Sequence, residues 1–377
     1  MKDLSARMER GTWSGKGAGH TEKRMKVWKI IGIVIAAVLA CAILFVVIAV
    51  IGFGGGYYRK DGTYRRATWK SSVAWTMQHP AFAEYGRFLL PWQEGAASVT
   101  VPPMSYFWMC LTTNWNTSDV VSGINFMIER EEADGAHFYH YYTQEEIAED
   151  AAKAETGLIY IPGDADKPFA FVVPGGGMTS EAITAEGFTA ARELHAQGYP
   201  VFIVKYRVST QRPMEEQEVI ANRDFGKALQ SIFANAAELG VRTEGYSVWG
   251  YSAGGRLCYL WGLDNEYGYT AYGLPAPAMS VLVYSGWHEA RFAEDYQTVP
   301  PTFFSYSRHD AVIGRDNVLA IEEFIAKLGR EGIRTEVRAY NRAPHGYGTG
   351  AGTEADGWMK YAYAFWEQLL ADRSETV

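Results

Sequence analysis

The stretch YSVWGYSAGGRLCYL, residues 246–260, joins a short β-type run to a helical run through a turn at Ser252. Within it, residues 250–254 match the pattern G-x-S-x-G. A serine in this pattern sits on a strained strand-to-helix turn that exposes its hydroxyl above a sheet edge, and the flanking glycines allow close backbone approach. The alternative is an ordinary glycine-rich turn, and the surrounding pattern favours the first interpretation.

From Gly157 onward, short β-type runs alternate with longer amphipathic helical segments. This rhythm is typical of an α/β fold, in which helices cover both faces of a mostly parallel sheet. The predicted strands are 157–161, 169–173, 201–206, 246–250, 279–286, 301–306 and 335–340. The predicted helices are 179–197, 215–239, 315–328, 358–370 and one from the Ser252 turn to Leu260.

A triple glycine in VPGGG, residues 173–177, ends one predicted strand and precedes a helix. Acyl transfer places negative charge on a carbonyl oxygen, so a site for it needs fixed backbone N–H donors. We expect Gly176 and Gly177 to supply two of them, and Ala253, directly after the serine, to supply a third. No phosphate-binding pattern such as GxxxxGK[ST] or GxGxxG accompanies these glycines.

An acid and a base should follow the serine in the chain order Ser, Asp or Glu, His. Asp310 lies in the loop after strand 301–306, and His345 follows strand 335–340. Because strand carboxyl ends converge on one crevice in open α/β sheets, these side chains are expected to meet Ser252. His309 is the alternative base, and Asp316, in the first turn of a helix, is the alternative acid.

Five segments carry a resemblance to a known family: PFAFVVPGGGMTSEA, GYPVFIVKYRV, SVWGYSAGGRL, PPTFFSYSRHDAVI and APHGYG. Together they resemble α/β-hydrolase fold esterases related to acetyl-esterases and the hormone-sensitive-lipase group, over roughly residues 157–370. The resemblance implies hydrolysis of carboxylic esters, often of short acyl groups, without a cofactor. Pro174 stands where the hormone-sensitive-lipase group has the histidine of its HGGG loop, which favours the acetyl-esterase-like branch.

The N-terminal region has the pattern of a membrane anchor. Residues 1–29 are a basic tail, and no charged residue occurs between Lys29 and Arg59. The apolar run 30–51 is long enough to cross about 30 Å of hydrocarbon and too long for a signal-peptide core. We therefore predict a transmembrane helix at 30–53. The basic tail before it favours an internal N-terminus and an extracytoplasmic catalytic domain, although basic residues are nearly balanced on the two sides.

Residues 54–155 are rich in aromatic side chains and lack the strand–helix rhythm, which predicts a mostly helical and irregular appendage before a catalytic domain at 156–377. The net charge of −8 combines a basic N-terminal region with an acidic body from Asp61 onward, and an acidic body gives no reason to expect nucleic acid binding. Cys110 and Cys258 are expected to be buried free thiols. His137 and His140 lack the context of a metal motif, so no metal site is predicted, and Arg207 is expected to be a structural donor.

The residues and the resemblance together predict a membrane-anchored serine hydrolase acting on short acyl esters, including acetylated carbohydrate. A serine peptidase of the prolyl-oligopeptidase type shares the order of catalytic residues, but the chain shows no propeller pattern. A non-catalytic pseudo-hydrolase used for binding is the third hypothesis. The usual mark of such proteins is a lost catalytic residue, and none is lost here.

Overall fold

The computed structural model of the chain describes residues 31, 33–36, 38, 39, 56–89, 105–133, 135–286 and 298–374. The predicted membrane helix at 30–53 and the basic tail at 1–29 therefore lie for the most part outside the described residues. No helix within the described ranges is long and apolar enough to cross a membrane. Residues from Gly56 onward form one compact unit, which is the part of the chain treated below.

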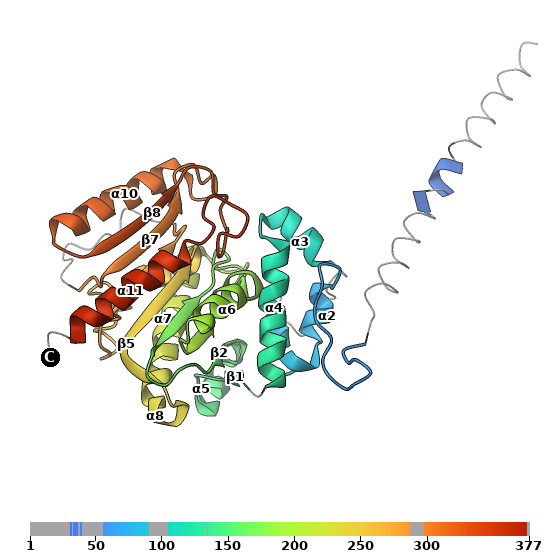
Figure 1. Cartoon of the computed structure of the whole chain (residues 1–377), viewed down its shortest axis with the longest axis horizontal. Helices are drawn as coiled ribbons and strands as arrows, with labels where there is room; N and C mark the ends of the chain where they lie inside the picture. The colour runs from blue at the N-terminus through green and yellow to red at the C-terminus, as the bar shows by residue number, and fades with distance from the viewer. Residues whose placement is uncertain are drawn as a thin grey trace, which may run out of the picture. The chain divides into compact units, whose positions relative to one another are not determined.

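A sheet in the order β1-β2-β4-β3-β5-β6-β7-β8 runs through the described residues of this unit (Figure 1). Neighbouring strands from β4 to β8 are parallel, whereas β1 with β2 and β2 with β4 are antiparallel. The strands are β1 (His137–Tyr139), β2 (Gly157–Ile161), β3 (Pro168–Val173), β4 (Val201–Lys205), β5 (Arg242–Tyr251), β6 (Met279–Val283), β7 (Thr302–Ser307) and β8 (Thr335–Tyr340).

Helices surround this sheet. The α-helices are α2 (Val73–Met77), α3 (Tyr106–Thr113), α4 (Thr117–Glu132), α5 (Gln144–Glu149), α6 (Phe188–Ala196), α7 (Met214–Ala234), α8 (Ala236–Leu239), α9 (Ala253–Trp261), α10 (Gly314–Arg330) and α11 (Met359–Ser374). Short 3-10 turns occur at Pro80–Phe82, Gly86–Leu89 and Ala151–Glu155, and one π-helical turn at Ile183–Gly187.

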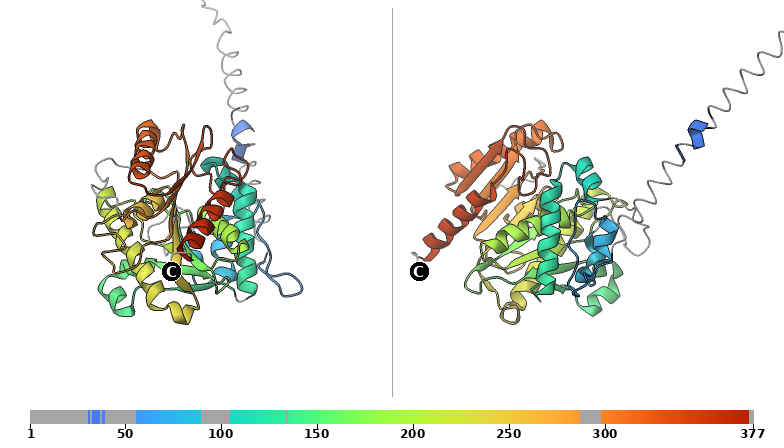
Figure 2. Two further views of the ribbon diagram at one scale, coloured as in Figure 1. Left: turned by 60° about the vertical axis from the view of Figure 1, so that its left-hand side comes forward. Right: turned by 45° about the vertical axis from the view of Figure 1, so that its right-hand side comes forward.

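Strands β2 to β8 send alternate side chains into two separate apolar clusters, one on each face of the sheet. In β4, Val201 and Ile203 join the first cluster, and Phe202 and Val204 join the second. The first cluster also contains side chains of α4, α6 and α11, and the second contains side chains of α7, α9 and α10. Helices therefore cover both faces, as the left view of Figure 2 shows with α10 on one side and α4 and α11 on the other.

The predicted α/β architecture agrees closely with these bounds. One difference is the segment 137–139, expected in the irregular appendage, which instead forms edge strand β1 against β2. Three residues are too few to show the alternation of a strand in the sequence, and this segment is extended because it pairs with β2. A second is that the strand predicted at 279–286 ends at Val283, because Tyr284 has a φ of 37°.

The aromatic-rich N-terminal segment shares its apolar core with the first face of the sheet. Ile124, Met127 and Ile128 of α4 are fully buried in the same cluster as the side chains of α6. The two helices cross closely at Gly123, where an added Cβ would lie 3.1 Å from the Thr189 nitrogen. In the described residues 56–89 and 105–133, the segment contains α2, α3, α4 and two 3-10 turns, and it also serves as a cover for α6.

Both cysteines of the described unit are buried and free, as predicted. Burial raises the pKa of the Cys110 thiol to about 11 and that of the Cys258 thiol well above its ordinary value. These thiols are therefore protonated at neutral pH and have little nucleophilic character.

Candidate active site

Ser252 lies on a tight turn between β5 and α9, with φ 49° and ψ −116°. Its amide donates a 2.9 Å hydrogen bond to the carbonyl of Val283, at the end of β6, which fixes the strained backbone. Gly250 is needed because a Cβ there would lie 2.5 Å from the carbonyl oxygen of Gly254. The side chain is half-buried at the carboxyl end of the sheet. These features match a nucleophile elbow.

Asp310 and His345 reach Ser252 from the loops after β7 and β8. Ser252 Oγ lies 2.9 Å from His345 Nε2, and His345 Nδ1 lies 2.7 Å from Asp310 Oδ2. The other oxygen of Asp310 accepts the amides of Val312 at 2.9 Å and Ile313 at 3.2 Å. Asp310 is 4% exposed, so its orientation is fixed. The three side chains form a continuous hydrogen-bonded chain, the geometry in which a histidine can take the serine proton.

The alternative base and acid lie elsewhere. His309 is exposed, and its Nδ1 is 2.9 Å from the carbonyl oxygen of Asn341. Asp316 is in the first turn of α10, where a carboxylate is favoured by the helix dipole. Neither residue takes part in the hydrogen-bonded chain at Ser252.

The glycine-rich loop after β3 lies directly against the elbow. A Cβ on Gly175 would stand 2.8 Å from the Cβ of Ser252 and 2.6 Å from the carbonyl oxygen of Tyr251. The Gly175 amide donates to Glu186, at 2.6 Å. In the described part of the chain, the amides of Gly176, Gly177 and Ala253 donate to no protein acceptor. Three amides beside the serine are therefore available to a substrate oxygen.

Glu186 and Tyr284, which the sequence did not indicate as site residues, support the site: Glu186 contacts the glycine-rich loop, and Tyr284 packs against His345. Glu186 is 3% exposed and bonds both the Gly175 amide and the Tyr284 hydroxyl. Burial raises the pKa of the Glu186 carboxyl, and the two donated hydrogen bonds and His345 oppose that rise. A glutamate inside the apolar run 182–191 was the available signal, because an acidic side chain rarely occupies such a position without a partner.

Buried Arg207 is structural, as predicted. It donates to both oxygens of Asp224 and forms an ion pair with Asp150 at 2.7 Å. Within the described ranges, no group of three His, Cys, Asp or Glu side chains is placed to hold a metal ion. His140 Nδ1 lies 3.1 Å from the carbonyl oxygen of Thr156.

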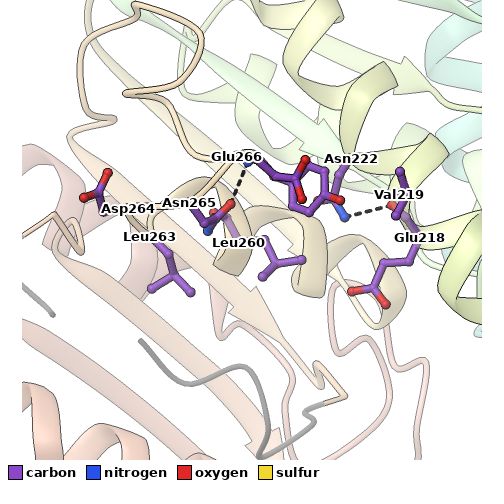
Figure 3. A pocket seen from close by; sticks show the side chains of 9 residues that line it. Glu218, Val219, Asn222, Leu260, Leu263, Asp264, Asn265 and Glu266 are labelled. Carbon is purple, nitrogen blue, oxygen red and sulfur yellow. Dashed lines mark hydrogen bonds between the residues drawn. The ribbon is translucent and has the colours of Figure 1, made fainter. Parts of the chain in front are cut away.

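A pocket of about 480 Å³ lies between α7 and the end of α9 with the segment that follows it. Figure 3 shows its lining, which is Glu218, Val219, Asn222, Leu260, Leu263, Asp264, Asn265, Glu266 and Tyr267. Its described lining includes none of the three hydrogen-bonded residues at Ser252. Glu218 at its edge is paired with Arg256 at 2.6 Å. The pocket is thus distinct from the serine site, and its glutamate already has a structural partner.

Comparisons with known proteins agree with this fold. The BD-FAE family model matches residues 158–271, a range that contains the glycine-rich loop and Ser252. No curated protein matches the chain significantly. A bifunctional acetyl ester-xyloside hydrolase from Caldicellulosiruptor lactoaceticus has a TM-score of 0.50 and 21% identity, over 62% of this chain and 96% of its own.

Two further structures are similar at slightly lower scores. The α/β hydrolase MGS-M1 from a Medee basin deep-sea metagenome library has a TM-score of 0.49 and 19% identity, over 63% of this chain and 99% of its own. Esterase 2 from Thermogutta terrifontis, phosphonylated by cyclosarin, has a TM-score of 0.49 and 18% identity, over 63% and 94%.

The sheet, the elbow and the similarity to solved structures show that the chain has an α/β-hydrolase fold. The predicted resemblance to esterases of this class is confirmed, as is the prediction of an enzyme of the serine-hydrolase type. The family match ends at residue 271, before Asp310 and His345.

Proposed function

We propose that the chain is a membrane-anchored carboxylesterase that uses Ser252 as nucleophile, His345 as general base and Asp310 as the residue that orients the base. The observation that carries the proposal is the hydrogen-bonded chain from Ser252 Oγ to His345 Nε2 and from His345 Nδ1 to Asp310 Oδ2. Few structural roles require these three groups to meet at a strained turn beside free amides.

The proposed reaction follows the two half-reactions of acyl transfer. His345 Nε2 takes the proton from Ser252 Oγ as the oxygen attacks the ester carbonyl, and the proton then passes to the departing alcohol. Water, deprotonated by the same nitrogen, then attacks the acyl carbonyl, the bond from that carbonyl to Ser252 Oγ breaks as the proton returns to Oγ, and the acid is released. The amides of Gly176, Gly177 and Ala253 stabilise the oxyanion in both steps, and Asp310 stabilises the cationic imidazole.

Activity of the full-length chain in detergent micelles tests the proposal with p-nitrophenyl acetate. Ser252→Ala and His345→Ala should each lose about 10⁴-fold or more of kcat, and Asp310→Asn somewhat less. His309→Ala is the matched control and should keep near-normal turnover, because its exposed ring lies at Asn341. Loss in His309→Ala with activity retained in His345→Ala would overturn the assignment of the base.

Short acyl esters are the proposed substrates, with acetylated carbohydrate as the natural class. The support is the motif-level resemblance and the lack of a long insertion in the sequence between Ser252 and Asp310, where hydrolases often place a lid. Rates with p-nitrophenyl esters from acetyl to dodecanoyl should peak at acetyl to butyryl. Acetylated xylo-oligosaccharides belong among the probes because one similar structure is named for acetyl ester hydrolysis. A peak at about C12 would contradict the proposal, and faster cleavage of peptide amides than esters would favour the peptidase hypothesis.

Anchoring by residues 30–53, with the catalytic domain extracytoplasmic, is the remaining part of the proposal. The supporting observation is the uncharged apolar run after a basic tail. Protease treatment of intact cells, or of spheroplasts where an outer membrane is present, should digest the catalytic domain. A fully protected domain with a digested N-terminal tail would reverse the proposed topology, and recovery of the protein in the membrane-free fraction would refute the anchor.

A further inference from the structure

Glu186 connects the glycine-rich loop to the end of β6. Its Oε2 accepts the Gly175 amide at 2.6 Å, and its Oε1 accepts the Tyr284 hydroxyl at 2.8 Å. The residue belongs to the π-helical turn before α6 and is 3% exposed. A buried carboxylate with two donors from separate segments holds those segments at a fixed separation, because breaking either bond leaves a buried polar group unpaired.

Tyr284 extends the connection to the histidine loop. Its oxygen accepts the amide of Gly348 at 3.2 Å, three residues after His345. Its ring packs edge-on against the His345 imidazole, with centroids 5.0 Å apart. Tyr284 is fully buried and has a φ of 37°, an uncommon backbone conformation for a non-glycine residue. The tyrosine thus contacts the base itself as well as the loop that carries it.

The hydrogen-bond directions favour an ionised Glu186. Because the Tyr284 oxygen accepts the Gly348 amide, its own proton is directed to Glu186 Oε1, while the Gly175 N–H occupies Oε2. Each carboxylate oxygen therefore accepts, which is the pattern of the anion.

His345 is the basic side chain that interacts electrostatically with Glu186 in the described chain. The other titratable groups that face Glu186 are tyrosines: Tyr206 after β4, Tyr251 at the end of β5, and Tyr284 after β6. Burial raises the pKa of each of these phenols well above its ordinary value, so they are neutral. Asp310 lies against Nδ1 of the His345 imidazole, at 2.7 Å. The imidazole thus interacts with two buried carboxylates, one by a direct hydrogen bond and one at longer range.

We propose that Glu186 is a positioning residue for catalysis, which fixes the glycine-rich loop and Tyr284 around Ser252 and favours the cationic form of His345. The inference rests on the proposed function of the serine site. Under this proposal, Glu186 is a second negative charge near the pair of Asp310 and His345. The hydrogen bond from Gly175 to Glu186 also explains why the Gly175 amide faces inward while the amides of Gly176 and Gly177 remain free.

Glu186→Gln removes the charge and keeps one accepting oxygen for the Gly175 amide, while its amide nitrogen can donate to the Tyr284 oxygen, which reverses the direction of that hydrogen bond. Without the negative charge, the acidic limb of the kcat/KM profile should move to lower pH, because a nearby opposite charge favours the charged form of a base. A purely structural role would lower activity without moving this limb. Glu186→Ala, which also removes both hydrogen bonds, should lose about 10²-fold of kcat.

Glu218→Gln is the matched control, because Glu218 is 2% exposed, lies on α7 and pairs with Arg256. The acidic limb of the kcat/KM profile of Glu218→Gln should stay at the pH of the wild-type limb. An unmoved limb in Glu186→Gln, or an equal shift in Glu218→Gln, overturns the proposal.

A second measurement does not depend on ester hydrolysis. In full-length protein with ¹³C-labelled histidine, the His345 ring signal is identified by its absence in His345→Ala, and its titration midpoint is followed by NMR. The midpoint should fall in Glu186→Gln and stay in Glu218→Gln. An inactive wild-type chain whose midpoint still responds would refute the ester proposal alone, whereas an unchanged midpoint would refute the role of Glu186 whatever the activity.

Discussion

Gly175→Ala tests whether the glycine-rich loop must lie against the nucleophile. The added methyl group would meet the Tyr251 carbonyl oxygen at 2.6 Å and the Ser252 Cβ at 2.8 Å. The Tyr251 oxygen and the Ser252 backbone belong to the elbow and cannot rotate aside. Ordinary contact begins at 3.4 Å, so the loop must retreat by about 0.8 Å, from 2.6 Å to 3.4 Å.

This retreat is enough to remove the function of the loop. Oxyanion donors act at about 2.7–3.1 Å, and the loss of one such donor costs about 10²–10³ in kcat. A shift of about 0.8 Å takes the amides of Gly176 and Gly177 beyond that range, so kcat should fall by at least about 10²-fold. The crowding should cost only about 1–3 kcal/mol of stability, as overpacking usually does.

Hydrolysis of p-nitrophenyl acetate, with thermal unfolding measured in parallel, checks the expectation. Gly329→Ala is the control, because Gly329 lies in α10 with nothing within 4 Å of its Cβ position. That variant should keep its activity and unfold at the same temperature or slightly higher. A folded Gly175→Ala protein with kcat within about threefold of wild type would refute the geometric reasoning.

Two further predictions concern carboxylates outside the hydrogen-bonded chain at Ser252. Burial raises the pKa of Glu181, which pairs with Lys205 at 3.0 Å, from 4.5 to about 8. The folded state therefore keeps a proton that the unfolded chain releases, so its stability contribution is present below pH 4.5 and lost as the pH rises to about 8. Chemical denaturation at pH 5 and pH 8 should show a smaller decline in unfolding free energy for Glu181→Gln than for wild type, and an equal decline would count against this. Asp119 accepts the Thr349 hydroxyl and Arg192, both at 2.7 Å. Asp119→Ala should therefore lose about 1–3 kcal/mol of unfolding free energy, and an unchanged denaturation midpoint would contradict that role.

The serine site was predictable because the sheet topology places its members by rule. Ser252, Asp310 and His345 each follow a strand, and in this sheet the strands β5, β7 and β8 are parallel with β6 between β5 and β7. Parallel neighbours bring their carboxyl ends to one edge, so a residue's place after a strand is enough to predict that it lies near the others. His309 follows β7 directly before Asp310, whereas His345 follows β8, so the strand order distinguishes the two histidines.

The supporting contacts were not predictable by that rule. Glu186 and Tyr284 are 98 residues apart and meet only because the turn before α6 and the end of β6 fold together behind the elbow. Neither belongs to a local motif, since a single glutamate or tyrosine in an apolar run is compatible with many partners. Edge strand β1 has the same limitation, because a three-residue strand owes its order to pairing with β2. The membrane helix at 30–53 stays a prediction.

The close crossing of α4 and α6 has a consequence for the order of events during synthesis. Helix α4 (Thr117–Glu132) leaves the ribosome well before α6 (Phe188–Ala196), yet Ile124 and Met127 are buried only when both helices are present. At about 5–20 residues per second, the intervening chain takes several seconds to appear. Throughout that interval the apolar side of α4 is exposed to water, as a surface that chaperones recognise. In translation without membranes, ribosome-bound nascent chains ending near residue 170 should therefore bind a chaperone that recognises exposed apolar side chains, and chains extended beyond residue 230 should release it.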